Sequence, residues 1–167
     1  MKPKIVEQGQ IMLLGFSFFG DPFRLSAGWT EENEIGRLWQ RFMVYLGQHR
    51  QRIKQIKPED VAYEVHIQHE ETPRTGEYEV FIGVEAEALE DVPVELTVKI
   101  LPPVVYAVFT LRGEQITSDW QQMIQEWMLR SGYESAYSYG FQRYDHRFKG
   151  IEQIEESGLD VNIPVKR

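Results

Sequence analysis

Two pairs of similar segments, one member of each pair in either half of the chain, limit its fold more than any other feature. Residues 10–20 and 103–113 are apolar runs that both end in glycine, and residues 78–84 align without gaps with residues 159–165. Self-similarity of this kind predicts two copies of one supersecondary unit that share a core. Chance similarity between strand-forming segments is the alternative, and the order of the remaining elements bears on the choice.

The first half shows the pattern of a strand, a helix and a hairpin. Its first apolar run ends at Gly20-Asp21-Pro22, which is typical of a turn. Apolar side chains then recur at helical spacing from Ile35 to Leu46, and Thr30 is the expected N-cap. Alternating apolar and polar residues predict the hairpin. The elements expected here are strands over 11–19, 61–68 and 78–84, and a helix from Thr30 to about Arg52.

The same order recurs in the second half, which favours duplication. Strands are expected over 104–111, 139–144 and 159–165, with a shorter helix between the first two. This helix carries Trp120 and Trp127 and stops at Ser131-Gly132, because glycine readily adopts the left-handed conformation that follows a helix. Residues 94–100 are either the end of a linker or an extra edge strand.

These patterns together predict one α+β domain over residues 1–167, built from two pseudo-symmetric β-α-β-β units at about 1–90 and 94–167. A chain of this length buries a core without disulfide bonds. We expect a mainly antiparallel sheet, with a ligand-binding cleft between the two halves.

Composition and charge narrow the classes of partner. The chain has no cysteine, which excludes disulfides and thiolate chemistry. No apolar segment approaches the ~18 residues of a membrane span and no signal peptide is recognisable, so we expect a cytoplasmic protein without membrane contact. The formal net charge of -8 disfavours direct nucleic-acid binding. Basic residues over 49–57 are interpreted as the end of the first helix rather than as a nucleic-acid patch.

Aromatic residues make up 13% of the chain. Core packing is the favoured interpretation for each of them alone, but as a set they are too numerous and too rich in tyrosine for a core only. A buried tyrosine hydroxyl needs a partner and suits a site with one wet end. Aromatic walls together with a carboxylate recognise flat or cationic organic ligands. The candidate carboxylate is Glu64, for which a solvent-facing strand position is an equally weighted alternative. The residues expected from this argument to bind ligand are Trp39, Tyr63, Glu64, Phe81, Tyr106, Trp127 and Tyr144.

Motifs for catalysis or metal binding are weak. His66 and His69 are three residues apart, so in a strand they point to opposite faces and cannot chelate one metal. Solvated polar residues are the favoured interpretation for both. Asp145-His146 has no accompanying Gly-x-Ser-x-Gly elbow, and the glycines of segment 15–20 lack the lysine of a phosphate-binding loop. We therefore expect no catalytic residues, no metal site and no cofactor.

Motifs spread over nearly the whole chain resemble the GyrI-like small-molecule-binding family. Related domains are the effector-binding modules of bacterial AraC-type and MerR-type transcription regulators. Each motif alone is loose, but their order and spacing make the resemblance specific. The segments that carry it are Gly15, Leu38–Phe42, Tyr78–Glu87, Tyr106–Thr110, Gly113, Trp127, Ser131–Glu134, Phe141–Phe148 and Ile163–Lys166.

The resemblance implies a cleft that binds drugs, dyes and other hydrophobic, often cationic compounds. Because the sequence begins directly with the first strand, we expect a standalone binder without a DNA-binding domain. The family usually has glutamate at the position of Gln142, which is therefore the eighth residue expected to bind ligand. Glutamine keeps hydrogen-bonding capacity but lacks the charge and the general base. Under the internal repeat Glu64 can be set against Gln142 and is expected to supply the missing carboxylate.

Three functions remain open, in order of preference. The first is a module that binds hydrophobic or weakly cationic small molecules, which we expect to be a multidrug-type binder rather than an enzyme. The second is a hydrolase of strained electrophilic compounds, as the resemblance implies for some standalone members, with Tyr63 polarising the substrate and Glu64 guiding water. The third is an interaction protein, either a homodimer or a modulator of a basic partner, which the charge of -8 permits.

Overall fold

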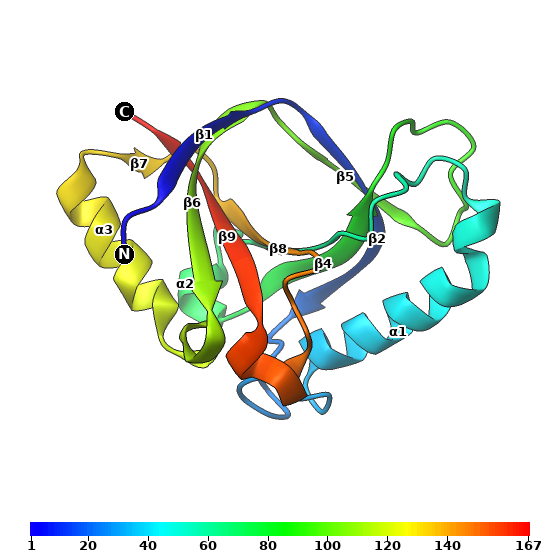
Figure 1. Cartoon of the computed structure of the whole chain (residues 1–167), viewed down its shortest axis with the longest axis horizontal. Coiled ribbons are helices and arrows are strands. Elements are labelled where there is room, and N and C mark those ends of the chain that lie inside the picture. Colours follow the sequence, from blue (N-terminus) through cyan, green and yellow to red (C-terminus); the bar gives the residue numbers. More distant parts are fainter.

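Nine strands, all paired antiparallel, form one sheet in the computed structural model, which describes residues Met1 to Arg167 (Figure 1). The strands are β1 (Lys4–Gln8), β2 (Ile11–Gly20), β3 (Ala62–Ile67), β4 (Tyr78–Glu85), β5 (Thr97–Leu101), β6 (Val104–Arg112), β7 (Glu134–Ser135), β8 (Tyr139–Tyr144) and β9 (Gly158–Lys166). The α-helices are α1 (Glu34–His49), α2 (Thr72–Thr75) and α3 (Trp120–Ser131), and the 3₁₀ helices are η1 (Arg50–Arg52), η2 (Gly113–Thr117) and η3 (Ile151–Glu156). The predicted α+β class is confirmed.

The strand order β1-β6-β9-β8-β3-β4-β2-β5 shows the predicted duplication. The two units are β2-α1-β3-β4 and β6-α3-β8-β9. In the first unit β4 lies between β2 and β3, and in the second β9 lies in the same way between β6 and β8. β3 pairs with β8 where the two halves join, and there Glu64 lies directly opposite Gln142. The pseudo-two-fold axis therefore passes between these two residues, which the sequence comparison had also set against each other.

The register of the last strand in each half differs by two residues from the sequence alignment. Gly15 pairs with Gly83, whereas Val108, its counterpart in the aligned first strands, pairs with Asn162. The gap-free alignment of residues 78–84 with 159–165 matches Gly83 to Pro164 instead. A two-residue shift keeps every side chain on its own face of the sheet, so alternation in the sequence does not detect it.

The sheet curls into a ring because its outer strands are parts of two long, bent strands. β1 continues into β2, and β5 continues through Pro102-Pro103 into β6. Lys4 pairs with Val108 and Gly15 pairs with Thr97, so one register runs through both bends. Figure 1 shows the resulting ring. Segment 94–100, for which two interpretations were open, thus contains most of an outer strand.

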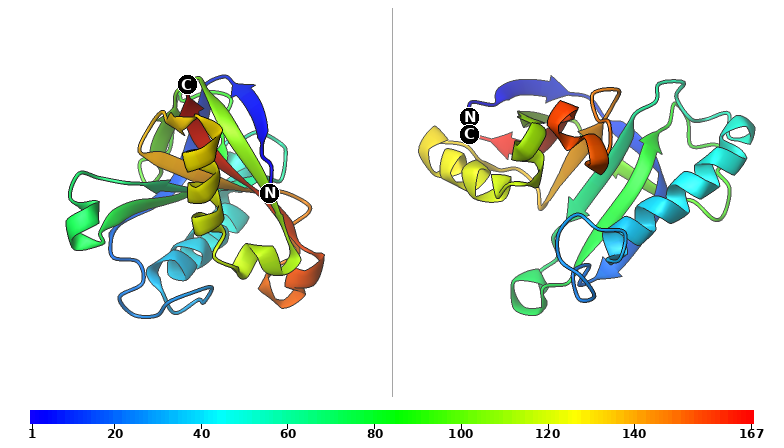
Figure 2. Two further views of the ribbon diagram at one scale, coloured as in Figure 1. Left: turned by 90° about the vertical axis from the view of Figure 1, so that its left-hand side faces the viewer. Right: turned by 60° about the horizontal axis from the view of Figure 1, so that its bottom comes forward.

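The two long helices lie outside the ring, one against each half (Figures 1 and 2). Leu38, Phe42 and Leu46 recur every four residues along α1 and pack against the outward side chains of β2 and β4. In the second half Ile124 of α3 joins Phe109 and the outward side chains of β6 and β9. The strands beneath the helices are therefore buried on their outer face.

A third core fills the interior of the ring, so most strands are buried on both faces. Its members are Ile11, Leu13, Tyr63, Val65, Phe81, Leu101, Tyr106 and Phe141. Burial on both sides explains why the strand sequences read as nearly continuous apolar runs. The outer face of β3 and β8, between the two helices, has no covering helix, and this is where the site lies.

The N-terminus of α1 lies one turn later than predicted. Asn33, not Thr30, is the N-cap: its Oδ1 accepts from the Gly36 amide at 2.9 Å, and its Nδ2 donates to the Gly28 carbonyl at 2.8 Å. A Cβ atom on Gly36 would lie 2.2 Å from the Thr30 carbonyl oxygen. Glycine at this position thus lets the preceding loop pack directly on the helix.

The helix also ends earlier than predicted, at His49, and the 3₁₀ turn η1 follows it to Arg52. No helix in the structure combines the length and the apolar character needed to cross a membrane.

A cleft between the two helices

A cleft of about 610 Å³ opens on the outer face of the sheet where the two halves meet. Its floor is formed by outward side chains of the central strands β3 and β8. One wall consists of α1 and the loop before it, and the other consists of residues 117–121 at the start of α3 and of residues 145–151. This volume is within the usual range for sites that bind small organic molecules.

The structure brings four of the eight predicted ligand-binding residues together in this cleft. Trp39 lies on its α1 wall, and Glu64, Gln142 and Tyr144 form part of its floor. The other four predicted residues lie elsewhere: Tyr63, Phe81 and Tyr106 in the core inside the ring, and Trp127 in the core beneath α3.

Strand alternation explains this division. Tyr63 and Glu64 are neighbours in β3, so their side chains point to opposite faces of the sheet. The Tyr63 hydroxyl donates to Oε2 of Glu85 at 3.4 Å, on the side away from the cleft. The pairing of Tyr63 with Glu64 that the hydrolase hypothesis requires is therefore not formed.

Trp127 is held by the second core rather than by the cleft. Its ring meets Phe109 edge-on at 5.4 Å between centroids and stacks on Tyr133 at 5.6 Å. Both contacts anchor the outer face of β6 and the end of α3, which is a structural role.

Glu64 is the charged centre of the floor, and its side chain is only 7% exposed. Oε1 accepts from the indole Nε1 of Trp39 at 2.6 Å, and Oε2 lies 2.7 Å from Nε2 of His66. His66 reaches it because residues two apart in a strand share a face. Both oxygens thus have a hydrogen-bonding partner, but neither has a lysine or arginine.

Nowhere in the chain do three or more His, Asp or Glu side chains gather in an arrangement that could hold a metal ion.

Gln142 and Tyr144 form the neutral half of the floor. The Tyr144 hydroxyl donates to Oε1 of Gln142 at 2.5 Å, and its ring packs edge-on against Trp39 and Phe148. Burial, and then the nearby carboxylate of Glu64, raises the pKa of Tyr144 well above its usual range. Tyr144 therefore stays a neutral donor at physiological pH.

Further aromatic side chains, three in loops and Trp120 at the start of α3, complete the walls and were not predicted to bind ligand. They are Phe23, Trp29, Trp120 and Phe148. Trp29 of the first half and Phe148 of the second half approach each other to 6.3 Å between ring centroids. Loop residues show no periodicity, so the one available signal was the presence of large aromatics outside the predicted elements. His66 was also missed, because it was interpreted as a solvated side chain.

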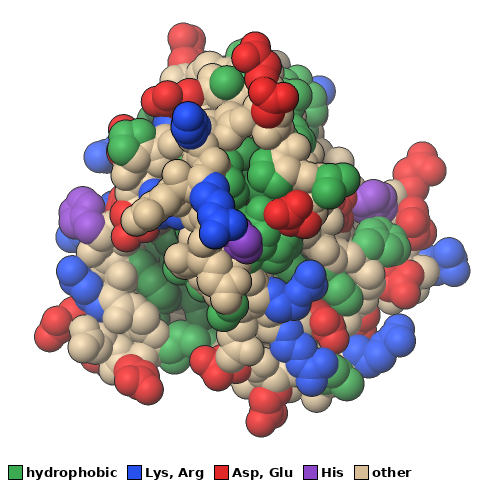
Figure 3. Space-filling view, turned by 90° about the vertical axis from the view of Figure 1, so that its right-hand side faces the viewer, with side chains coloured by type: hydrophobic (Ala, Val, Ile, Leu, Met, Phe, Trp, Pro, Cys, Tyr) green, Lys and Arg blue, Asp and Glu red, His purple; other side chains and the backbone are tan.

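The lining of the cleft is acidic. It includes no lysine or arginine, and its carboxylates are Glu31, Asp60, Glu64, Asp119 and Asp145. Elsewhere on the surface the two signs are interspersed, as the face seen in Figure 3 shows. A concave, low-dielectric site lined by one sign of charge concentrates that field and attracts counterions, here cations.

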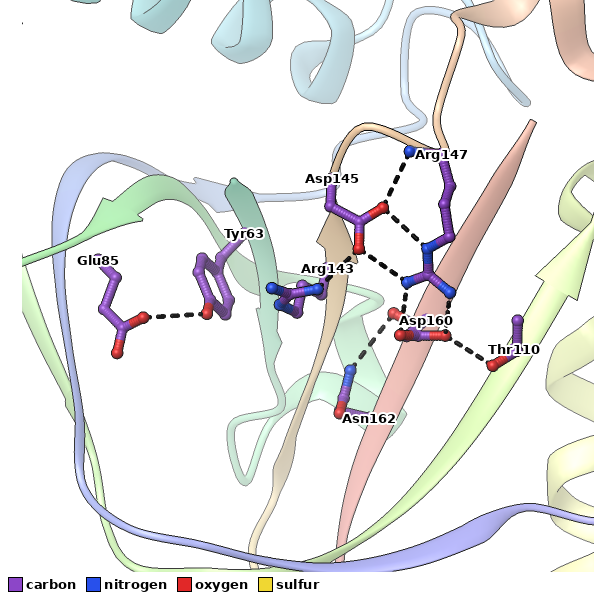
Figure 4. A network of polar contacts seen from close by, with 8 residues as sticks. All are labelled: Tyr63, Glu85, Thr110, Arg143, Asp145, Arg147, Asp160 and Asn162. Atoms are coloured by element: carbon purple, nitrogen blue, oxygen red, sulfur yellow. Dashed lines mark hydrogen bonds and ion pairs between the residues drawn. The ribbon is translucent and has the colours of Figure 1, made fainter. Parts of the chain in front are cut away.

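Asp145 differs from Glu64 because its charge is compensated (Figure 4). Arg147 donates from Nε to Asp145 at 2.8 Å and from Nη2 to Asp160 at 2.6 Å, and Nη1 of Arg143 reaches Asp145 at 2.8 Å. Burial opposes ionisation of Asp145, but the hydrogen bonds from Arg147 outweigh it and lower the pKa of Asp145 to about 2. This network fixes the wall of the second half, whereas Glu64 is a buried acid without a lysine or arginine partner.

Comparison with known proteins finds matches to one family model and to solved structures. The model for integron-associated effector binding proteins, Cass2, matches residues 4–165. No curated protein matches the chain by sequence.

Three solved structures share the fold over almost the whole chain. SAV2435 bound to tetraphenylphosphonium has a TM-score of 0.72 and 15% identity, with 99% of this chain and 94% of that chain covered. The C-terminal domain of EcmrR has a TM-score of 0.67 and 11% identity over 99% and 98% of the chains. The integron cassette protein VCH_CASS2 from the mobile metagenome of Vibrio cholerae has a TM-score of 0.59 and 17% identity over 99% and 96%.

Proposed function

This chain belongs to the Cass2 family of integron-associated effector binding proteins, and we propose that the effector it binds in the cleft is a hydrophobic organic cation. The membership confirms the predicted resemblance to GyrI-like effector-binding domains. One observation carries the finer proposal: Glu64 is a buried carboxylate at the base of an aromatic cleft whose lining contains no lysine or arginine.

The charge of the lining selects the sign of the charge that the ligand carries. An anion entering the cleft meets carboxylates on the floor and on both walls, and the lining offers it no lysine or arginine. A cation instead offsets the cost of burying Glu64, since a buried charge is stabilised by an opposite charge nearby. The aromatic rings add cation–π attraction, which contributes about 0.5–2 kcal/mol for a well-placed ring.

The hydrogen bonds of Glu64 select the kind of cation. Trp39 and His66 already occupy its two oxygens and hold the carboxylate in place. A ligand whose charge is shielded by apolar groups, such as a phosphonium or a quaternary ammonium ion, needs no hydrogen bond from Glu64. It binds through charge and aromatic contact alone, so this class is favoured over primary amines.

The related structures support the proposal at the level of ligand class. SAV2435, which shares the fold, is bound to tetraphenylphosphonium, a cation of this type. Here the charge comes from Glu64 of the first half, while Gln142 supplies only a hydrogen-bond acceptor, which Tyr144 uses.

A fluorescence titration tests the proposal, because three of the four tryptophans line the cleft. We expect tetraphenylphosphonium to quench tryptophan emission saturably at one site per chain. Triphenylphosphine oxide, a neutral compound with similar rings, is expected to bind at least about tenfold more weakly, which corresponds to about 1.4 kcal/mol for the charge. Equal affinity for the two compounds, or no quenching by either, would overturn the proposal.

A further inference from the structure

A second cavity of about 280 Å³ lies inside the ring, on the opposite face of β3 and β8 from the cleft. We call it the inner cavity. Tyr63 and Arg143, which are cross-strand neighbours, both line it, and their sequence neighbours Glu64, Gln142 and Tyr144 line the cleft. Two strands therefore separate two sites of different character.

The inner cavity is rich in hydrogen-bond donors. Lys57, Tyr63, Arg143 and Asn162 all line it, and Glu85 is its one acidic residue. Its lining thus has two cationic side chains against one carboxylate, in a chain whose formal charge is -8.

Glu85, the one acid in this cavity, already has a partner at each of its two carboxylate oxygens. Lys57 Nζ lies 2.9 Å from Oε1 of Glu85, and the Tyr63 hydroxyl lies 3.4 Å from Oε2 (Figure 4 shows the latter contact). Burial, and then the charge of Glu85, raises the pKa of Tyr63, so its hydroxyl remains protonated and able to donate. Glu85 therefore does not leave a negative charge free to repel an anion.

Arg143 is the second cationic side chain that lines the inner cavity. It makes one ion pair, from Nη1 to Asp145 at 2.8 Å, and Asp145 is shared with Arg147, which also pairs with Asp160. In Figure 4 the guanidinium of Arg143 lies between Tyr63 and Asp145. A guanidinium has five N–H donors in a planar fork that matches a carboxylate, so donors remain after the contact with Asp145.

The other side of the inner cavity is apolar. Ile11, Tyr106 and Phe141 face it from the core inside the ring. Its volume of 280 Å³ corresponds to about nine waters at ~30 Å³ each, which is room for a molecule of a few carbon atoms. A ligand that suits both sides has an anionic head and a short apolar tail.

We propose that the inner cavity is a second binding site, which takes a short-chain carboxylate with its head at Arg143 and its tail against Tyr106 and Phe141. The proposal does not rest on the function of the cleft, because it uses side chains of the opposite face of the sheet. The inner cavity and the cleft thus bind ligands of opposite charge.

Titration with butyrate, followed by the backbone amide signals in ¹H–¹⁵N NMR spectra of the full chain, tests this proposal. We expect saturable shifts centred on Tyr63, Arg143 and Asn162, and no such shifts with butyramide, which lacks the charge. Inorganic phosphate serves as the second anion: shifts at the same residues with an affinity equal to that of butyrate would reject the apolar tail and hence the carboxylate assignment.

Two variants and one control locate the site. Arg143→Gln is expected to weaken butyrate binding at least about tenfold, as loss of a charged hydrogen bond predicts. Val6 lines the inner cavity and is exposed, so Val6→Trp is expected to block the site with little effect on the fold. Arg52→Gln, at an exposed arginine outside the cavity, should leave binding unchanged. Equal binding by wild type, Arg143→Gln and Val6→Trp, or shifts that map to another surface, would overturn the proposal.

Discussion

The two halves of the molecule share a topology but contribute different chemistry to the cleft between them. At the pseudo-two-fold axis the first half places Glu64 and the second half places Gln142, directly opposite each other. The acid of the first half has no lysine or arginine partner, whereas Asp145, an acid of the second half in the same cleft, is held by two arginines. Duplication therefore supplies a symmetric cleft, and side-chain replacement on one side decides where its charge lies.

The helices repeat this contrast. α1 runs along the cleft and contributes Trp39 from its middle, where the indole donates to Glu64. α3 contributes only its first turn, around Trp120, and its later tryptophan, Trp127, is buried in the second core. The first half thus provides the buried carboxylate and the group that orients it. The second half provides neutral floor residues and aromatic surface, and its acids Asp119 and Asp145 lie on the wall.

The substitution Glu64→Gln should have the largest effect on ligand affinity, because it removes the difference between the two halves at the pseudo-two-fold axis. We expect the affinity for tetraphenylphosphonium to fall about 30-fold, or ~2 kcal/mol, since the cation loses the buried opposite charge. Calorimetric titration measures this. Glu31→Gln, at an exposed acid of the same cleft, is the matched control and should change the affinity by less than about threefold because water and salt screen it.

Arg147→Gln tests the compensated acid of the second half. Loss of the cation shared by Asp145 and Asp160 is expected to lower the free energy of unfolding by ~2 kcal/mol, as measured by urea denaturation at pH 7.

The pH dependence of this effect has a definite sign. Because the pKa of Asp145 is lowered to about 2 in the folded protein, its stabilising contribution is complete above its unfolded pKa of about 3.9. It is lost as the pH falls from about 4 towards 2, so wild type and Arg147→Gln should converge in that window. A difference that stays constant down to pH 2 would contradict the role given to Asp145.

Trp39→Phe tests the contribution that α1 makes to ligand binding. It removes the indole donor at 2.6 Å from Glu64 and leaves one carboxylate oxygen without its partner. The affinity for tetraphenylphosphonium is expected to fall about fivefold, or ~1 kcal/mol, the usual size of one such hydrogen bond. Tyr144→Phe, which removes a donor to neutral Gln142, provides the counterpart from the second half and should have a smaller effect on affinity.

Trp127→Phe should have the smallest effect on ligand binding. Its contacts are with Phe109 and Tyr133 in the second core, so the affinity should stay within about twofold of wild type while the free energy of unfolding falls by ~1–2 kcal/mol. A large loss of affinity, measured by calorimetry, would show that α3 contributes more to the cleft than its first turn.

The sequence predicts the fold well because its local signals are strong. Gly132 ends α3 as expected, and the duplicated order of elements matches the sheet. β1 was not predicted, since all five of its residues are exposed and show no alternation. The structure makes Asn162 the counterpart of Gly83, two residues away from the match that the sequence alignment gives. This difference was not predicted, because a shift of two residues leaves the alternation of side chains unchanged.

The sequence separates the site from the core less well. Strands buried on both faces give no sign of which face meets the cleft, so Tyr63 and Glu64 were assigned to one site although they lie on opposite faces. Trp29 and Phe148 belong to loops, whose positions depend on tertiary packing. The internal repeat succeeded where periodicity could not, because it set Glu64 against Gln142.

Exchange of the two residues at the axis tests the central claim most directly. The protein that carries both Glu64→Gln and Gln142→Glu keeps one carboxylate in the cleft but moves it to the other half. Calorimetric titration with tetraphenylphosphonium should then show an affinity within about fivefold of wild type, because the two positions face the same cleft across one strand pairing. A folded double variant that binds as weakly as Glu64→Gln alone would contradict the claim that the buried charge at this axis selects the ligand.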